Sequence, residues 1–278
     1  MNKYINKIIT GDSLQKLSNK EIFPDNSIDL IITSPPYADR RANTHKSSEY
    51  VEWFLPIAEQ LKRILKPNGS FILNIKENVA KHERQTYTYE LLLELKEQGW
   101  MWREEYCWYK NTSFPGYWPK RFRDNWERIY HFSKDIEIKF NRNAVKVPIG
   151  KWAEKRFNGK DIEHDKKRHV SKTGSGLSRE VNKWKGKKEV DPHNVLEFTP
   201  VTNNINHSAA YPVYLPLWFI KLLSKKGDLI LDPFMGSGTT AIAALELERK
   251  YIGIEIQASY SKVARKRIKE YKKSKIDS

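Results

Sequence analysis

The sequence predicts an α/β protein whose central sheet is parallel and is covered by helices on both faces. Strand-like and helix-like patterns alternate in the first third of the chain and again in the last third. The predicted strands are nearly continuous apolar runs, which is typical of strands buried on both faces. With 278 residues, the chain is long enough for one large domain, or for one catalytic domain that carries an insertion.

In the first third, a β-branched run follows a Pro-Asp-Asn turn, and apolar residues then recur at three- and four-residue spacing. These patterns predict a strand over 28–33, a helix from about 47 to 66, a strand over 70–75 and a helix over 89–98. Pro67 and Gly69 end the first helix, and Pro56 predicts either a kink in it or a later start. The last third repeats the alternation, with a strand over 228–232, a helix over 239–248, a strand over 251–256 and a helix over 259–271.

The middle of the chain has a different composition. Residues 141–192 lack clear periodicity and hold 15 Lys and Arg against seven Asp and Glu, a net charge of +8 in 52 residues. The whole chain carries 50 Lys and Arg against 34 Asp and Glu, a net charge of +16. Such an excess favours a nucleic acid partner, because each neutralised phosphate releases counterions, although a basic proteome is another explanation. We expect an inserted basic module, or a partly disordered loop, in this region.

Other features exclude several classes of protein. A single cysteine, Cys107, excludes a disulfide scaffold and a Cys-rich zinc site. His164 and His169 are poorly spaced for one helical face, so we expect no metal site. No apolar run approaches the roughly 20 residues that cross a bilayer, and no secretory signal is recognisable at the N-terminus. We therefore expect a soluble, cytoplasmic protein that does not bind a membrane.

The segment 231–240, Leu-Asp-Pro-Phe-Met-Gly-Ser-Gly-Thr-Thr, lies where a predicted strand gives way to a helix. Glycines there let the backbone approach a ligand, and the helix N-terminus offers free N–H groups. The segment lacks the Gly-Lys-Ser/Thr ending of a P-loop and the third glycine of a dinucleotide fingerprint, and alone it could be an ordinary tight turn. Glu255, 17 residues after Gly238, ends the next predicted strand, where this architecture binds ribose hydroxyls. Together these features favour an adenosine-containing cofactor such as S-adenosylmethionine.

A second motif, Ser34-Pro35-Pro36-Tyr37, directly follows the predicted strand 28–33. Paired prolines lack N–H donors and hold the chain extended, which leaves carbonyl groups free to face a ligand. Ser34 adds a hydroxyl group and Tyr37 an aromatic face. Such a loop suits the recognition of a flipped base by its exocyclic amine, although a lone motif of this kind is also typical of a proline turn that closes a strand.

In this order, the motifs resemble those of the β class of DNA amino-methyltransferases, in which an SPPY-type motif precedes a target-recognition region and a DPFxGSG-type loop. Residues 9–14 resemble the family's GD element, residues 121–127 the strand before the target-recognition region, and residues 206–212 the segment that cradles the methionine end of the cofactor. The resemblance covers about 200 residues. It departs at Ser208 and Ala209, which replace the expected Pro-Ala.

The resemblance implies a Rossmann-like sheet of the S-adenosylmethionine-dependent methyltransferases, with permuted motif order. It divides the chain into a catalytic part over 1–134, a basic target-recognition insert over 135–197 and a cofactor-binding part over 198–278 of the same domain. The insert and the surrounding cations would bind double-stranded DNA. The expected DNA-binding residues are Arg40, Arg41, Lys166, Lys167 and Arg168.

The same resemblance assigns roles within the site. Ser34 Oγ and the Pro35 carbonyl would accept hydrogen bonds from the target amine, beside Pro36, and Tyr37 would stack on the extruded base. Asp12 would contact the adenine and Glu255 the ribose. The full expected cofactor-binding set is Asp12, His207, Pro212, Asp232, Phe234, Gly236, Ser237, Gly238, Thr239 and Glu255.

The implied reaction is transfer of a methyl group from S-adenosylmethionine to the exocyclic N4 amine of cytosine in duplex DNA, by base flipping and direct in-line transfer. A restriction system, with a cognate endonuclease acting on the same site, is the expected context. Family members with Ser before Pro-Pro-Tyr mostly modify cytosine N4, and those with Asp or Asn mostly modify adenine N6, which is the main alternative. Methylation of RNA or of protein glutamine, and a binding module with a degenerate pocket, are further alternatives. Cytosine C5 chemistry is rejected because Cys107 lies in a predicted aromatic core strand.

Overall fold

The computed structural model describes residues 1–39, 44–112, 120–151, 154, 186–200 and 211–276. They belong to two compact units, one of Met1–Asn141 with Asn194–Ser278 and one of Arg142–His193. Among the described residues, no helix has the length and apolar character needed to cross a membrane.

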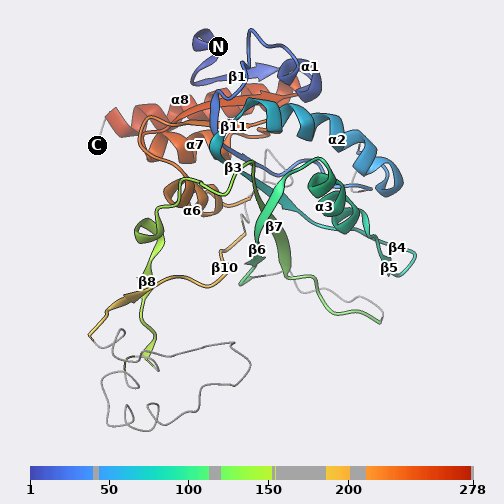
Figure 1. The fold of residues 1–278 in the computed structure, drawn as a ribbon. Coiled ribbons are helices and arrows are strands. Elements are labelled where there is room, and N and C mark those ends of the chain that lie inside the picture. The colour runs from blue at the N-terminus through green and yellow to red at the C-terminus, as the bar shows by residue number, and fades with distance from the viewer. Residues whose placement is uncertain (40–43, 113–119, 152–153, 155–185, 201–210, 277–278) are drawn as a thin grey trace. The chain divides into compact units, whose positions relative to one another are not determined.

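The first unit is built on an eight-stranded sheet with the order β1-β12-β11-β2-β3-β7-β6-β10 (Figure 1). Its strands are β1 (Lys7–Thr10), β2 (Ile28–Thr33), β3 (Leu65–Ile75), β6 (Met101–Tyr109), β7 (Trp126–Ser133), β10 (Val195–Glu197), β11 (Leu229–Asp232) and β12 (Lys250–Glu255). All neighbours are parallel except at β7, which is antiparallel to both β3 and β6. The prediction of a parallel sheet is thus confirmed for β1, β12, β11, β2 and β3 and is wrong at β7. Antiparallel neighbours need no crossover helix, so strand–helix alternation could not indicate this strand's direction.

Helices cover the two faces of this sheet. The helices are α1 (Ser13–Leu17), α2 (Ser47–Ile64), α3 (Tyr87–Glu97), α6 (Tyr214–Leu223), α7 (Thr239–Glu246) and α8 (Ala258–Ile276). Helices α1, α2 and α3 pack along one another, and so do α6, α7 and α8 (Figure 1). Successive strand residues point to opposite faces. Accordingly, Phe71 and Leu73 join the core cluster of α1–α3, whereas Ile72 between them is equally buried outside that cluster.

Most of the predicted elements are confirmed, with shifts at their ends. Strand β2 has the predicted bounds, and α2 buries the apolar residues that recur at three- and four-residue spacing. This helix begins at Ser47 with Pro56 inside it, so the alternative of a later start is wrong. It ends at Ile64 because Leu65 is already extended and pairs with Ile28 as the first residue of β3. Two short strands, β4 (Val79–Ala80) and β5 (Glu83–Arg84), form a hairpin beyond β3.

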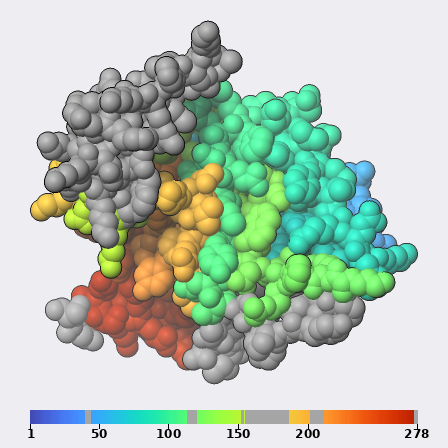
Figure 2. All heavy atoms as spheres, turned by 90° about the horizontal axis from the view of Figure 1, so that it is seen from below, coloured from blue at the N-terminus to red at the C-terminus, as the bar shows by residue number. Residues whose placement is uncertain are grey.

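The second unit contains the 3-10 helix η2 (Arg142–Val145) and a pairing of β8 (Val147–Pro148) with β9 (Glu189–Val190). An Arg142–Asp191 ion pair of 2.9 Å joins its two ends. The unit is narrower than the segment 135–197 expected as the insert. On one side, Lys139 lies in the first unit, where it pairs with Asp29 and Asp228. On the other side, β10 extends the main sheet beside β6. In Figure 2, golden atoms of this part of the chain lie against green atoms of the first unit.

Candidate active site

Five polar residues lie where adjacent parallel strands end. Asp12 follows β1, Glu255 ends β12, Asp232 ends β11, Ser34 follows β2 and Asn74 lies near the end of β3. Because the carboxyl ends of parallel strands meet at one edge of a sheet, the loops there form the usual ligand crevice of an open α/β sheet. The two motifs that the sequence indicates are therefore neighbours, although they are about 200 residues apart in the chain.

The loop after β2 is held by a hydrogen-bond network on its Ser34 and Tyr37 side chains. Ser34 Oγ donates to Tyr37 Oη at 3.1 Å, and Tyr37 Oη donates to Glu127 Oε2 at 2.6 Å. Asn74 Nδ2 donates to Tyr37 Oη at 2.8 Å, to Glu127 Oε2 at 3.0 Å and to Ser34 Oγ at 3.3 Å. Lys110 Nζ donates to the other oxygen of Glu127, Oε1, at 2.5 Å. The hydroxyl that the sequence predicts to meet substrate is thus linked to an ion pair whose carboxylate is buried.

The charge state of this network follows from burial and from its cation. Burial alone would raise the pKa of Glu127, but the Lys110 ammonium and the hydrogen bonds from Tyr37 and Asn74 lower it below its ordinary value. Burial, together with the Glu127 carboxylate, raises the pKa of Tyr37 well above its ordinary value. Glu127 is therefore ionised at neutral pH, and Tyr37 keeps its proton and donates it.

Sequence reasoning assigned no role to Asn74, Lys110 or Glu127. Asn74 is the polar residue in the apolar run 71–75 of β3, and it is only 2% exposed, so its position could have pointed to the site. Glu127 belongs to the segment 121–127 that carried the resemblance, and only its last two residues lie in β7. Lys110 follows β6 in a region without a recognised motif.

On the cofactor side, Asp232 ties the two loops together. Its Oδ1 accepts hydrogen bonds from Thr33 Oγ1 at 2.7 Å and from the Phe234 N–H at 3.0 Å. Its Oδ2 accepts from Tyr211 Oη at 3.1 Å and also from Thr240 Oγ1. Burial raises the pKa of Asp232, and these four hydrogen bonds oppose the rise. Both carboxylate oxygens are engaged within the protein, so the contribution of Asp232 to a ligand site is to fix the loop backbone.

Glu255 closes the glycine loop from the next strand. Its Oε2 accepts from the Gly236 N–H and its Oε1 from the Gln257 N–H, each at 2.8 Å. Burial raises the pKa of this carboxyl, and its backbone hydrogen bonds oppose the rise. Gly236 and Gly238 have φ values of 53° and 87°, a region that favours glycine. The loop therefore needs these glycines for its shape, and each Glu255 oxygen retains a lone pair for a further donor.

Other predicted residues lie around the same loop. Thr239 begins α7, and Arg267 of α8 donates to the Ser237 carbonyl at 2.6 Å and to its Oγ at 2.7 Å. The Phe234 ring packs against Trp53, with ring centroids 5.7 Å apart. Pro212 accepts a hydrogen bond from the Leu215 N–H near the start of α6.

The GD element also adjoins the glycine loop. Asp12 Oδ1 caps α1 by accepting from the Gln15 N–H at 2.8 Å, and the residue is exposed. Ser13 Oγ donates to the Pro233 carbonyl at 2.5 Å, which joins this element to the segment 231–240. The remaining predicted residues lie outside the described part of the chain: Arg40, Arg41, Lys166, Lys167, Arg168 and His207.

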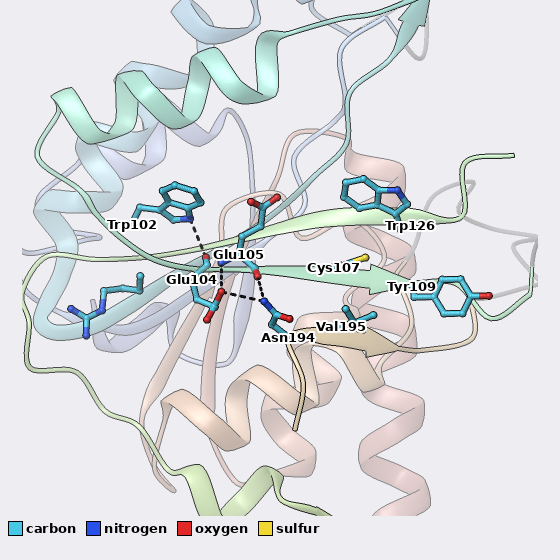
Figure 3. A pocket seen from close by; sticks show the side chains of 9 residues that line it. Trp102, Glu104, Glu105, Cys107, Tyr109, Trp126, Asn194 and Val195 are labelled. Atoms are coloured by element: carbon cyan, nitrogen blue, oxygen red, sulfur yellow. Dashed lines mark hydrogen bonds between the residues drawn. The ribbon is translucent and has the colours of Figure 1, made fainter. Parts of the chain in front are cut away.

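An open pocket of about 720 Å³ lies elsewhere, on β6, β7 and β10 (Figure 3). It is lined by Trp102, Arg103, Glu104, Glu105, Cys107, Tyr109, Trp126, Asn194 and Val195. None of the predicted site residues that the structure describes lines it. Cys107 lies here between the buried Tyr106 and Trp108, as the aromatic pattern predicts, and burial raises the pKa of its thiol.

Comparisons with known proteins agree with the motifs. The family described as DNA methylase matches residues 28–266. The type II methyltransferase M.PvuII of Proteus hauseri is 30% identical over 274 residues, covering 90% of this chain and 80% of that protein. The solved structure titled PvuII DNA methyltransferase (cytosine-N4-specific) has a TM-score of 0.70 at 26% identity, covering 93% of this chain and 84% of that chain.

Two further relatives widen the comparison. The DNA adenine methyltransferase YhdJ of Escherichia coli is 27% identical over 272 residues, covering 94% of this chain and 82% of that protein. A DNA modification methylase of Thermus thermophilus, solved in complex with S-adenosyl-L-methionine, shares the fold with a TM-score of 0.65 at 20% identity, covering 95% of this chain and 93% of that chain.

The matched range includes the Ser34–Tyr37 loop, the Asn74–Glu127 network and the glycine loop. The resemblance inferred from the motifs and the predicted fold class are thus both confirmed. The chain belongs to the family of N6- and N4-specific DNA methylases.

Proposed function

We propose that this protein methylates the exocyclic N4 amine of cytosine in duplex DNA. The observation that carries the proposal is the hydroxyl of Ser34, which supplies a neutral hydrogen-bond acceptor where a carboxylate or amide would otherwise stand. The name of the cytosine-N4-specific PvuII enzyme, at 26% identity and a TM-score of 0.70, supports the same base. A restriction system in a bacterial or archaeal cytoplasm, with a cognate endonuclease, is the proposed context.

S-adenosylmethionine is the proposed methyl donor, and the described residues fit it. Gly236 and Gly238, in the loop at the end of β11, have positive φ angles, and glycines there let the backbone approach a ligand closely. Glu255 on the neighbouring strand presents a carboxylate for the ribose hydroxyls. Asp12, in the loop after β1, has a carboxylate oxygen outside its capping bond that suits the adenine amine. When bound, the cofactor supplies an electrophilic sulfonium methyl group. The Thermus thermophilus methylase, solved with this cofactor, supports the assignment.

In the proposed reaction the residues of this chain hold and orient the base. Ser34 Oγ and the Pro35 carbonyl accept hydrogen bonds from the two N–H groups of the flipped amine, which directs its lone pair towards the methyl group. The half-buried Tyr37 ring stacks on the base while its hydroxyl remains bonded to Glu127. A nitrogen–carbon bond forms as the sulfur–carbon bond breaks, and the amine afterwards releases one proton. Glu127 and Cys107 form no covalent bond with the substrate.

Recognition of DNA is proposed to depend on the basic region 141–192, with Arg40 and Arg41 near the extruded strand. The proposal rests on the net charge of +8 in that region. DNA affinity should fall steeply with salt, since each phosphate contact releases counterions.

N6-adenine methylation is the second candidate, because the relative YhdJ is named a DNA adenine methyltransferase. The test is methylation of a random DNA library with tritiated S-adenosylmethionine, followed by single-molecule sequencing of modified positions. We expect N4-methylcytosine at one short sequence. Modified adenine, or labelled RNA or protein in parallel reactions without labelled DNA, would overturn the proposal.

A further inference from the structure

We propose that Glu127 and Lys110 are positioning residues that hold the Ser34 hydroxyl as a hydrogen-bond acceptor towards the target amine. They act through Tyr37, which joins Ser34 to Glu127 in a chain of hydrogen bonds. In this chain the donor and the acceptor of every bond are fixed. This inference rests on the proposed function of the Ser34 loop, although it holds for a cytosine or an adenine amine alike.

The direction of the chain follows from the donors and acceptors available. Lys110 has only donors, and an ionised Glu127 has only acceptors. Tyr37 carries one hydroxyl proton, which is donated to Glu127 Oε2 at 2.6 Å. The lone pairs of Tyr37 Oη must then accept, and the Ser34 hydroxyl donates to them at 3.1 Å. Because Ser34 has a single proton and it is used in this bond, Ser34 Oγ can only accept from a substrate.

Asn74 strengthens the same direction. Its Nδ2 donates to Tyr37 Oη at 2.8 Å and to Glu127 Oε2 at 3.0 Å, so it adds donors only where acceptors are required. Its contact with Ser34 Oγ is longer, at 3.3 Å, which leaves one lone pair of that oxygen available. The Tyr37 hydroxyl therefore has one donor bond and two acceptor bonds, a complete set for a phenol.

The direction matters for the chemistry because a free serine hydroxyl can rotate. If its O–H pointed to the substrate, it would bond to the lone pair of the amine, the electron pair that must attack the methyl carbon. A hydroxyl fixed as an acceptor instead engages an amine N–H and leaves the lone pair free. Preorganised hydrogen bonds of this kind are among the larger contributions to catalysis.

The chain requires an ionised Glu127. A protonated Glu127 could donate to Tyr37 Oη, which would allow Tyr37 to donate to Ser34 and reverse the chain. In the described part of the chain, the charged and titratable groups that contact Glu127 are Lys110 beyond β6 and Tyr37 in the loop, while β3 contributes the neutral Asn74. Lys76, the residue after β3, donates at 3.0 Å to the carbonyl of Trp126, the residue before Glu127. Lys110 is the cation in direct contact, and its side chain is 22% exposed against 9% for Glu127.

Three variants test the inference in the full-length protein, with steady-state kinetics on duplex DNA that contains the sequence identified by the library methylation assay. Glu127→Gln keeps the shape but can donate to Tyr37, so kcat should fall about 100-fold at every pH. The Kd for S-adenosylmethionine and the KM for DNA should stay within about threefold. Glu105→Gln removes a carboxylate on β6 that pairs with Arg128 outside this network, and it should leave kcat unchanged.

Lys110→Met should change the pH dependence of kcat, which a merely structural role of Lys110 would leave unchanged. Without the ammonium, burial dominates and Glu127 becomes protonated at higher pH. The kcat of this variant should therefore be low near pH 6 and should recover towards pH 9, while wild-type kcat shows no such step over about the same range. Tyr37→Phe combined with Glu127→Gln should be no slower than the slower single variant, because both changes break one chain.

A kcat of Glu127→Gln within about threefold of wild type would overturn the inference, as would a pH-independent loss in Lys110→Met. If Lys110→Met does not fold, the double-mutant cycle of Glu127→Gln and Tyr37→Phe decides between the outcomes. Additive losses of kcat in that cycle would contradict a single chain of hydrogen bonds through both residues. The proposed function is judged separately, because the modified base made by the wild-type protein is read before any variant is measured.

Discussion

The site contains two buried carboxylates, Glu127 and Asp232, whose surroundings differ in one respect. Glu127 has an ammonium partner in Lys110, and its pKa is lowered despite burial. Asp232 has four neutral donors and no cation among its partners in the described part of the chain, and burial raises its pKa. Neutral hydrogen bonds thus stabilise a buried carboxylate without fully replacing its hydration, whereas a cation in contact keeps it charged. We infer that Asp232 joins two loops and that Glu127 directs hydrogen bonds.

The largest expected effect is the loss of stability in Asp232→Ala. The change leaves the Thr33 hydroxyl and the Phe234 N–H without their acceptor, and it leaves the Tyr211 and Thr240 hydroxyls with only their bond to each other. We expect the free energy of unfolding to fall by about 3 kcal/mol, measured by urea denaturation. As a control, Asp12→Ala removes only a helix cap and should reduce it by about 1 kcal/mol. Equal losses in the two variants would contradict the joining role of Asp232.

On the other side of the comparison, Ser34→Ala should affect turnover and not the fold. We expect kcat to fall about 100-fold because the amine loses one acceptor. The free energy of unfolding should change by less than about 1 kcal/mol, since Tyr37 Oη still bonds to Glu127 and Asn74. Unchanged kcat with saturating DNA and cofactor would show that Ser34 is not the amine acceptor.

Glu255→Ala tests the cofactor side of the site directly. Loss of the carboxylate removes the acceptor of the Gly236 and Gln257 N–H groups and the proposed ribose contact. We expect calorimetry to show a Kd for S-adenosylmethionine weakened about 30-fold, or roughly 2 kcal/mol. DNA affinity without cofactor should be unaltered, and cofactor affinity equal to wild type would remove Glu255 from the site.

The smallest expected effect concerns how stability depends on pH, and its sign should differ between Glu127 and Asp232. The pKa of Glu127 is lowered in the folded state, so its contribution to stability is present above the ordinary value of 4.5 and is lost as pH falls through the lowered pKa. The pKa of Asp232 is raised, so its contribution is greatest below 3.8 and is lost as pH rises through the raised pKa. Relative to Glu127→Gln and Asp232→Asn, wild-type stability should change with pH in opposite directions. Urea denaturation between about pH 3 and 6 measures both, and slopes of one sign would contradict the comparison.

Local sequence patterns predicted the elements that carry the two motifs, but they did not predict the network around Ser34. Strand β2 and the glycine loop are each one continuous segment of the sequence, so local patterns were sufficient to predict each of them. The network around Ser34 instead depends on the antiparallel pairing that sets Asn74 opposite Ile129 and Glu127 opposite Trp108. These pairings bring together Asn74 and Glu127, which are 53 positions apart, and such a contact has no local signature in the sequence. For the same reason, the antiparallel direction of β7 could not be read from strand–helix alternation.

The most direct test of the account is the identity of the methylated base. Duplex DNA should be incubated with the protein and S-adenosylmethionine, digested to nucleosides and separated by liquid chromatography with mass detection. We expect N4-methylcytosine, at a level that falls about 100-fold with Ser34→Ala. N6-methyladenine without N4-methylcytosine would contradict it.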